Sequence, residues 1–156
     1  MRLRRAARAI VLDPAERILL VHFRFPSASF WAPPGGGIEE GETPEQTVAR
    51  ELDEETGLVD FEPGPWVWTR THVFPFDNGL WDGQTDRYML VRTHAFEPAA
   101  RFTAAELEAE YVAGIRWWTP AELALSDERF SPSRLPELIA ALLRDGPPRE
   151  PIEVGV

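Results

Sequence analysis

The chain has 156 residues, of which 44% are hydrophobic, and a formal net charge of −10 at pH 7. This length suffices for one hydrophobic core but not for two ordinary domains, so we expect a single domain over residues 1–156. The acidic balance argues against binding to a nucleic-acid polymer or an anionic membrane, since phosphate contacts need surplus Lys and Arg, and an anionic substrate would need a metal ion or a local basic group.

The chain has no cysteine, which excludes a disulfide framework, a thiolate metal site and a cysteine nucleophile. Its arginine-rich start has the charge of a signal peptide, but the apolar run at residues 6–12 is interrupted by Arg8 and ends at Asp13. No apolar run approaches the length of a membrane span. We therefore expect a cytoplasmic protein whose arginine-rich start leads into a first strand.

The first part of the chain reads as two strands and a long loop. Residues 6–12 and 17–25 are rich in aliphatic and aromatic side chains, and the turn residues 13–16 separate them. Residues 26–37 contain several prolines and end in three consecutive glycines. Because Pro and Gly interrupt regular structure, we expect a loop there.

Residues 44–56 carry the signals of a helix. Thr43 is a suitable N-cap, Pro44 suits the first helical position, and Gln46 completes a capping box. Gly57 suits the C-terminal stop. The sequence therefore predicts a helix with defined ends over residues 44–56.

The pattern returns to strands after this helix. Residues 66–74 and 86–93 flank the turn signal Asn78-Gly79. Such alternation of strands and helices predicts an α/β fold in which helices cover a sheet. The remaining expected elements are a short strand at 115–119, a brief helix at 120–124, a terminal helix at 132–144 and an irregular tail from about residue 145.

Three glutamates share one face of the predicted helix. Glu54 and Glu55 follow Glu51 by three and four residues, so their carboxylates converge and repel one another. Oxygen ligands of this kind suit hard cations, Mg²⁺ or Mn²⁺, which would offset the repulsion. The glycines at 35–37 would let the backbone approach the same place.

Residues 36–58 match a known motif in full. They reproduce every specified position of the Nudix box, G-x5-E-x7-R-E-U-x-E-E-x-G-U, where U is a bulky aliphatic residue, and the preceding W-A-P-P-G-G is similar to the family's usual lead. The chain therefore resembles the Nudix (MutT-type) hydrolases, which implies an α/β/α sandwich with a mixed sheet. The matching residues are Gly36, Glu42, Arg50, Glu51, Leu52, Glu54, Glu55, Gly57 and Leu58.

The resemblance implies a magnesium-dependent reaction, with Mn²⁺ as a possible substitute. Water would attack a phosphorus of a nucleoside diphosphate linked to another group, X, and break a diphosphate bond. Arg50 would orient the glutamates, and Glu42 would brace the loop against the helix. The implied metal ligands are Glu51, Glu54, Glu55 and the Gly35 carbonyl.

The general base is left open by the sequence. Within the family it is either a box glutamate, here Glu51, or an acid from a later loop. Residues 104–111 offer Glu106, Glu108 and Glu110, of which we favour Glu108. A solvated acidic helix or loop is the competing interpretation of this segment.

Residues outside the box would recognise the substrate. Strand alternation over residues 66–74 places Trp66, Trp68 and Arg70 on one face, where an aromatic ring would stack on a base and the guanidinium would meet a phosphate. Packing of these aromatics under a helix is the equally weighted alternative. Arg24 is a further candidate for substrate binding, and Gln84 a weaker one.

The predicted function is thus that of a Nudix pyrophosphohydrolase acting on a small-molecule nucleotide. A non-catalytic Nudix-like regulator, which binds nucleotide without cleaving it, is the alternative, although such proteins typically have a degraded box. The sequence leaves a nucleoside triphosphate, an ADP-sugar and a dinucleotide open as substrates. It also leaves the oligomeric state open, with a homodimer as one option.

Overall fold

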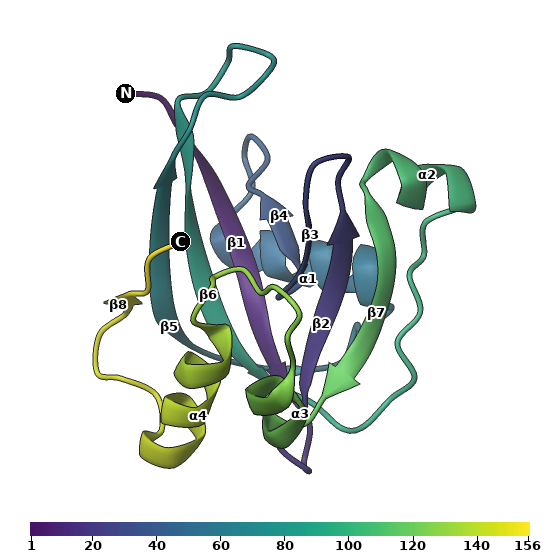
Figure 1. Ribbon diagram of the computed structural model, residues 1–156, viewed down its shortest axis with the longest axis vertical. Helices are drawn as coiled ribbons and strands as arrows, with labels where there is room; N and C mark the ends of the chain where they lie inside the picture. Colours follow the sequence, from purple (N-terminus) through teal and green to yellow (C-terminus); the bar gives the residue numbers. More distant parts are fainter.

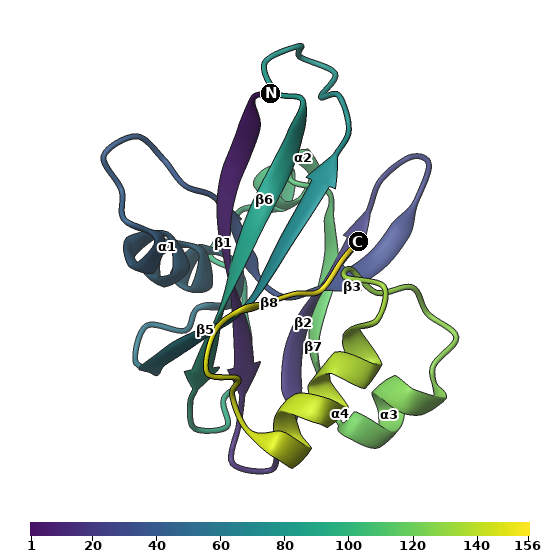
Figure 2. The same cartoon turned by 90° about the vertical axis from the view of Figure 1, so that its left-hand side faces the viewer.

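The computed structural model describes residues 1–156 and has an α/β/α architecture, as predicted. Helix α1 (Pro44–Thr56) lies on one side of a mixed sheet, and helices α3 (Pro120–Leu125) and α4 (Leu135–Asp145) lie on the other (Figure 2). A short helix, α2 (Ala104–Ala109), precedes the last long strand. The strands are β1 (Leu3–Leu12), β2 (Ile18–Arg24), β3 (Ser29–Ala32), β4 (Gly35–Gly37), β5 (Glu62–Val73), β6 (Gly83–Arg92), β7 (Val112–Trp118) and β8 (Ile152–Glu153).

The sheet separates into two halves beyond the β1–β2 turn. These strands are paired only through Leu12 and Ile18, and they diverge from that point (Figure 1). On one side, β1 runs parallel to β6, which pairs with β5. On the other side, β2 pairs with both β3 and β7. Strand β4 lies against residues 6–8 of β1, on the side opposite β6, so it stands in the divide between the halves.

Two hydrophobic clusters hold the layers together. The larger one joins one face of the sheet to α3 and α4 and includes Ile10, Trp68 and Ile139. The smaller one joins the opposite face to α1 through side chains such as Val11 and Leu52. Because burial of one Leu or Ile side chain contributes roughly 1.5–3 kcal/mol, both faces of the sheet are firmly anchored.

Helix α1 begins and ends as the sequence predicts. Thr43 accepts a hydrogen bond from the Gln46 amide, and the Gln46 side chain bonds back to the Thr43 amide, which completes the capping box. Gly57 follows the helix with φ of 79°, a left-handed conformation that favours glycine. None of the helices of the chain has the length and apolar character needed to cross a membrane.

The predicted loop at 26–37 is wrong, because it contains strands β3 and β4. Strand β4 consists of three glycines, so no pattern of side chains predicts it from the sequence. It is a strand because it pairs with β1. The terminal helix begins at Leu135 rather than at residue 132, and the tail includes the two-residue strand β8, which pairs with β5.

Strand β5 departs from simple alternation at a β-bulge. Trp66 pairs with Met89, whereas Trp68 pairs with Tyr88, so Val67 is an extra residue on this strand. The bulge turns Trp66 toward the α1 side and Trp68 toward the α3–α4 side. The prediction that both tryptophans share one face is therefore wrong.

Candidate active site

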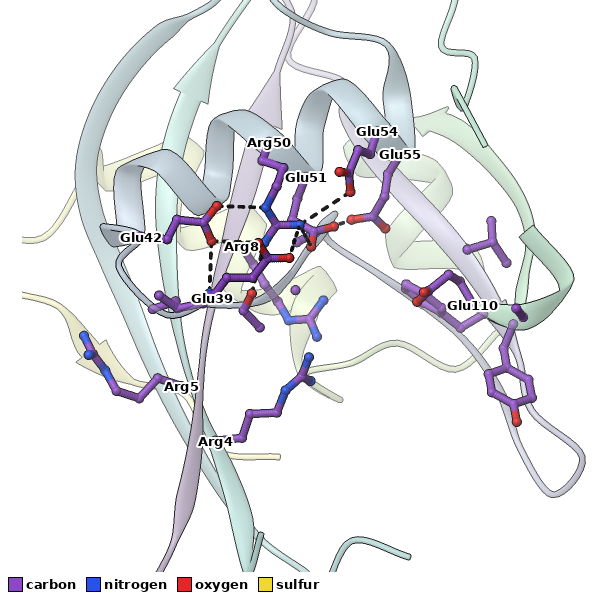
Figure 3. A pocket seen from close by; sticks show the side chains of 18 of the residues that line it. Arg4, Arg5, Arg8, Glu39, Glu42, Arg50, Glu51, Glu54, Glu55 and Glu110 are labelled. Carbon is purple, nitrogen blue, oxygen red and sulfur yellow. Dashed lines mark hydrogen bonds and ion pairs between the residues drawn. The ribbon is translucent and has the colours of Figure 1, made fainter. Parts of the chain in front are cut away.

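A cavity of about 970 Å³ opens in the divide between the two halves of the sheet. Helix α1, strand β4 and the start of β1 form one wall, and the β2–β3 hairpin with the α2–β7 turn forms the other. Figure 3 shows the glutamates of α1 at one end, arginines of β1 below them, and Glu110 across the cavity. This size suits a ligand as large as a nucleotide.

Arg50 ties the glutamates of the box together. Its Nε donates to Glu42 Oε2 at 2.8 Å, and its Nη1 donates to Glu51 Oε1 at 2.8 Å. The same Nη1 lies 3.4 Å from Glu54 Oε2. Its Nη2 donates to the Gly37 carbonyl at 3.1 Å, which links the helix to β4. Arg50 thus contacts Glu42, Glu51 and Glu54 at the same time.

Glu42 fastens the loop before α1 to the helix. Besides the two guanidinium contacts of Arg50, its Oε1 accepts from the Thr47 hydroxyl at 2.6 Å and from the Glu39 amide at 3.1 Å. The hydrogen bond from Arg50 is the main reason that the pKa of Glu42 falls to about 2. Glu42 is therefore ionised throughout the neutral range and fully occupied in bracing the loop.

Glu55 is the most buried carboxylate of the cavity, with 6% of its surface exposed. Its Oε1 accepts a hydrogen bond from the Gly35 amide at 2.9 Å. Burial, followed by the neighbouring Glu51 carboxyl, raises the pKa of Glu55 well above its ordinary value. Burial and Glu51 also raise the pKa of Glu54. Glu51 thus disfavours the charge of both Glu54 and Glu55, and a cation would relieve that cost.

Strand β4 presents a free backbone edge to this cluster. The Ile38 amide donates to Arg5 and the Ala9 amide donates to Pro34 across the β1–β4 pair, so Gly35 is at a position not bonded to β1. Its carbonyl accordingly points toward the open side of β4. A side chain at Gly36 would collide with the Glu51 carboxylate, which explains the glycine there.

The oxygen donors are of the kind that suits a hard divalent cation, but the side chains are not arranged as a preformed metal site. No group of three or more His, Cys, Asp or Glu side chains is close enough to hold an ion as the side chains lie. Glu51 is turned toward Arg50, and Glu54 lies at the more exposed rim. Carboxylates and a carbonyl are nevertheless the ligands that Mg²⁺ prefers, with water and phosphate oxygens completing its shell.

Two arginines of β1 lie on the other face of β4. Arg8 is fixed by Asp86, to which its Nε donates at 2.8 Å, and Arg4 donates to Gln84 at 3.0 Å. Gln84 in turn donates to the same oxygen of Asp86 at 2.9 Å. Asp86 is fully buried, so this network holds both guanidinium groups in place. The cavity therefore has carboxylates on one side of the β4 edge and arginines on the other.

The acids predicted near residue 108 have separate places. Glu110 lines the cavity, whereas Glu106 caps the start of α2 by accepting from the Thr103 amide at 3.0 Å. Glu108 is exposed and does not line the cavity, so the preference for Glu108 as the base is wrong. Sequence reasoning could not choose among them because α2 turns each acid in a different direction.

None of the predicted substrate-binding residues lines the cavity. Trp68 is 1% exposed in the α3–α4 core, and Trp66 packs on the α1 side, where Arg87 stacks 4.2 Å above its ring. Arg70 is held 3.5 Å from the buried Asp86. Arg24 alternates with Phe23 and Phe25 along the strand and so projects from the opposite face. The predicted substrate contacts of Trp66, Trp68, Arg70 and Arg24 are wrong for this cavity.

The cavity is lined instead by residues that include Arg4, Arg8, Phe23, Phe25 and Tyr111. Arg4 and Arg8 are four residues apart on β1 and therefore share a face. Their spacing could have identified them as a pair if the first strand had been predicted to begin at Leu3 rather than at residue 6. No comparable signal identifies Phe25 and Tyr111, which come from a hairpin and from a turn far apart in the chain.

Comparison with known proteins identifies the family of the chain. The family model described as NUDIX domain matches residues 2–139. Nudix hydrolase 25 of Arabidopsis thaliana is 32% identical over 126 residues, which cover 73% of this chain and 71% of that protein. The RNA pyrophosphohydrolase of Sulfurovum sp. is 43% identical over 97 residues, or 54% of this chain and 59% of that protein.

Solved structures show the same fold. The MutT NUDIX hydrolase from Burkholderia pseudomallei is 23% identical, with a TM-score of 0.64 over 87% of this chain and 96% of that chain. The NUDIX domain of Shewanella oneidensis NrtR, complexed with ADP ribose, is 21% identical, with a TM-score of 0.66 over 92% of this chain and 90% of that chain.

Proposed function

The chain belongs to the NUDIX family and is a pyrophosphohydrolase, and we propose that it cleaves a diphosphate bond in a nucleoside diphosphate linked to another group, with Mg²⁺ as cofactor. One observation carries this proposal. The carboxylates of α1 and the arginines of β1 line the same cavity on opposite sides of the β4 edge, so one site can hold both a cation and a phosphate chain.

The cation would be held by Glu51, Glu54, Glu55 and the Gly35 carbonyl. A bound Mg²⁺ or Mn²⁺ supplies polarisation of phosphoryl oxygens and a lowered pKa of bound water. Arg50 holds Glu51 and Glu54 through its Nη1 contacts. These contacts fix the carboxylates before substrate arrives, which is how a prearranged site lowers a barrier.

The phosphates would be oriented by Arg4 and Arg8. Their guanidinium groups are held by Gln84 and Asp86, so little side-chain entropy is lost when they bind phosphate oxygens. Of the acids considered as general base, Glu51 lies at this end of the cavity and Glu110 at the other. We assign proton acceptance to Glu51, because the base must reach the attacking water.

The test is turnover of a nucleotide panel by purified protein with Mg²⁺, with products resolved by chromatography. The panel contains nucleoside triphosphates, an ADP-sugar and a dinucleotide polyphosphate. Glu54→Gln keeps the size of the side chain and removes its charge, and should lower kcat by orders of magnitude without changing the melting temperature. Binding without turnover by the unaltered protein would instead identify a nucleotide-binding regulator.

The relatives named RNA pyrophosphohydrolase suggest a second candidate substrate, the 5′ end of an RNA. The chain spans a little over half of the length of those relatives, with 59% and 56% covered. The net charge of −10 opposes binding of a polyanion, so we favour the small nucleotide. Competition between GTP and 5′-triphosphorylated RNA decides this, since an RNA substrate should be used at higher kcat/KM than free GTP.

A further inference from the structure

The wall of the cavity opposite α1 and β4 is aromatic. Phe25 stands at the tip of the β2–β3 hairpin and Tyr111 in the α2–β7 turn, and their ring centroids lie 4.7 Å apart. Phe23 continues the cluster, with its ring centroid 6.3 Å from that of Phe25. All three line the cavity. Clustered aromatic side chains in a cavity offer stacking surface to a planar ligand.

Tyr111 has a backbone conformation that favours glycine. It follows the last residue of α2 and its C-cap, and its φ of 59° lies in the left-handed region. Glycine or asparagine normally occupies this position after a helix. The Tyr111 carbonyl accepts from the Arg24 amide at 2.9 Å, which fixes the turn to β2. A bulky residue in this conformation, 45% exposed, indicates that its side chain is needed in the cavity.

Glu110 places a carboxylate beside this aromatic wall. It precedes Tyr111 in the chain, lines the cavity, and stands across from the glutamates of α1 in Figure 3. It takes part in none of the salt bridges of the chain. An ionised carboxylate only accepts hydrogen bonds, so it selects ligands that present donors.

We infer that this wall is a subsite for a purine base and that Glu110 makes it selective for guanine. The base stacks on Phe25 and Tyr111, and the Glu110 carboxylate accepts from the N1–H and the 2-amino group of guanine. On its Watson–Crick edge, adenine presents one amino donor beside the ring nitrogen N1, which is an acceptor. This acceptor repels a carboxylate. The inference rests on the proposed function, which places the phosphates at the α1 end.

Binding of GMP, AMP and ribose 5-phosphate, measured by calorimetry, tests the stacking. These probes contain no diphosphate bond, so hydrolysis cannot disturb the measurement. Tyr111→Ala should weaken GMP and AMP by about 10- to 100-fold and leave ribose 5-phosphate unchanged, whereas Tyr111→Phe should retain nucleotide affinity. Phe74→Ala removes a partly exposed aromatic outside the cavity and should bind as the parent does.

The role of Glu110 is tested by the ratio of GMP to AMP affinity. The parent should prefer GMP by about 10-fold or more, and Glu110→Gln should bring this ratio close to one, because an amide accepts less strongly and can also face adenine. Glu108→Gln, in α2 two residues before Glu110 and outside the cavity, should keep the ratio. An unchanged ratio in Glu110→Gln, or parental nucleotide affinity in Tyr111→Ala, would overturn the inference.

These outcomes separate the subsite from the hydrolase proposal. Base-dependent binding that Tyr111→Ala removes, together with absent turnover, would leave the guanine subsite standing and reject the hydrolase. Equal hydrolysis of GTP and inorganic tripolyphosphate, with equal binding of GMP and ribose 5-phosphate, would reject the subsite and leave the hydrolase standing.

Discussion

Glu42→Gln should destabilise the protein in a way that depends on pH. The Glu42 carboxylate is 13% exposed and lies 2.8 Å from Arg50 Nε, and this contact is the main reason, with hydrogen bonds from Thr47 and the Glu39 amide, that its pKa falls from 4.5 to about 2. A group whose folded pKa is depressed contributes stability above its unfolded pKa and loses it as pH falls through the folded value. At 1.36 kcal/mol per pKa unit, the contribution is roughly 3 kcal/mol at pH 7 and about 1.4 kcal/mol at pH 3.

The measurement is urea unfolding of the parent and Glu42→Gln at both pH values. At pH 7 the variant should lose about 2 to 3 kcal/mol, since water at the cavity rim weakens the ion pair, which corresponds to a melting temperature lower by roughly 4 to 12 °C. At pH 3 the difference should be about half as large.

Glu39→Gln is the matched control for this prediction. Its carboxylate also faces Arg50, but at 3.7 Å and with 68% of the side chain exposed. Such an exposed pair contributes at most about 1 kcal/mol, so we expect little change. A Glu42→Gln effect of the same size at both pH values, or one no larger than that of Glu39→Gln, would refute the electrostatic account and leave a purely steric role for Glu42.

Three other predictions concern the remaining parts of the structure. Mg²⁺ at millimolar concentration should raise the melting temperature of the parent more than Na⁺ of equal ionic strength does, and Glu54→Gln combined with Glu55→Gln should abolish that increment, because ligands that bind only the folded state stabilise it. Arg8→Gln should lower kcat/KM by about 10-fold or more if the guanidinium contacts phosphate, whereas Arg24→Gln, from the opposite face of its strand, should leave kcat/KM unchanged. Trp68→Ala should lower the free energy of unfolding by about 3 to 5 kcal/mol and leave the KM of the folded protein unchanged. A changed KM at normal stability would instead indicate that Trp68 contacts the substrate.

Local signals account for what the sequence predicts well. The cap at Thr43, the stop at Gly57 and the spacing of the glutamates all act within one or two turns of helix, so α1 and its acidic face follow from neighbouring residues alone. Glu55 and Arg50 can therefore be placed in the site without knowledge of the tertiary structure.

The rest depends on contacts between distant segments. Strand β4 exists because β1 pairs with it, and three glycines carry no side-chain pattern that would reveal this. The bulge at Val67 inverts the faces of β5, which is why simple alternation places Trp66 and Trp68 on one surface when they lie on two. Arg8 enters the site only because β4 and the diverging β2 leave its face of β1 open to the cavity.

The two ends of the cavity are built from different halves of the sheet, and this separates chemistry from recognition. The carboxylates, the β4 edge and the arginines belong to the half formed by β1 and α1, and their positions are fixed by Arg50 and Asp86. In the aromatic wall, Phe23 belongs to β2, whereas Phe25 and Tyr111 belong to the β2–β3 loop and the α2–β7 turn, which are short connecting segments. Connecting segments tolerate substitution more readily than the elements they join. The base subsite proposed above predicts that a change at Tyr111 alters which base is accepted without disturbing the box, so that the box sets the reaction class and the opposite wall selects the base.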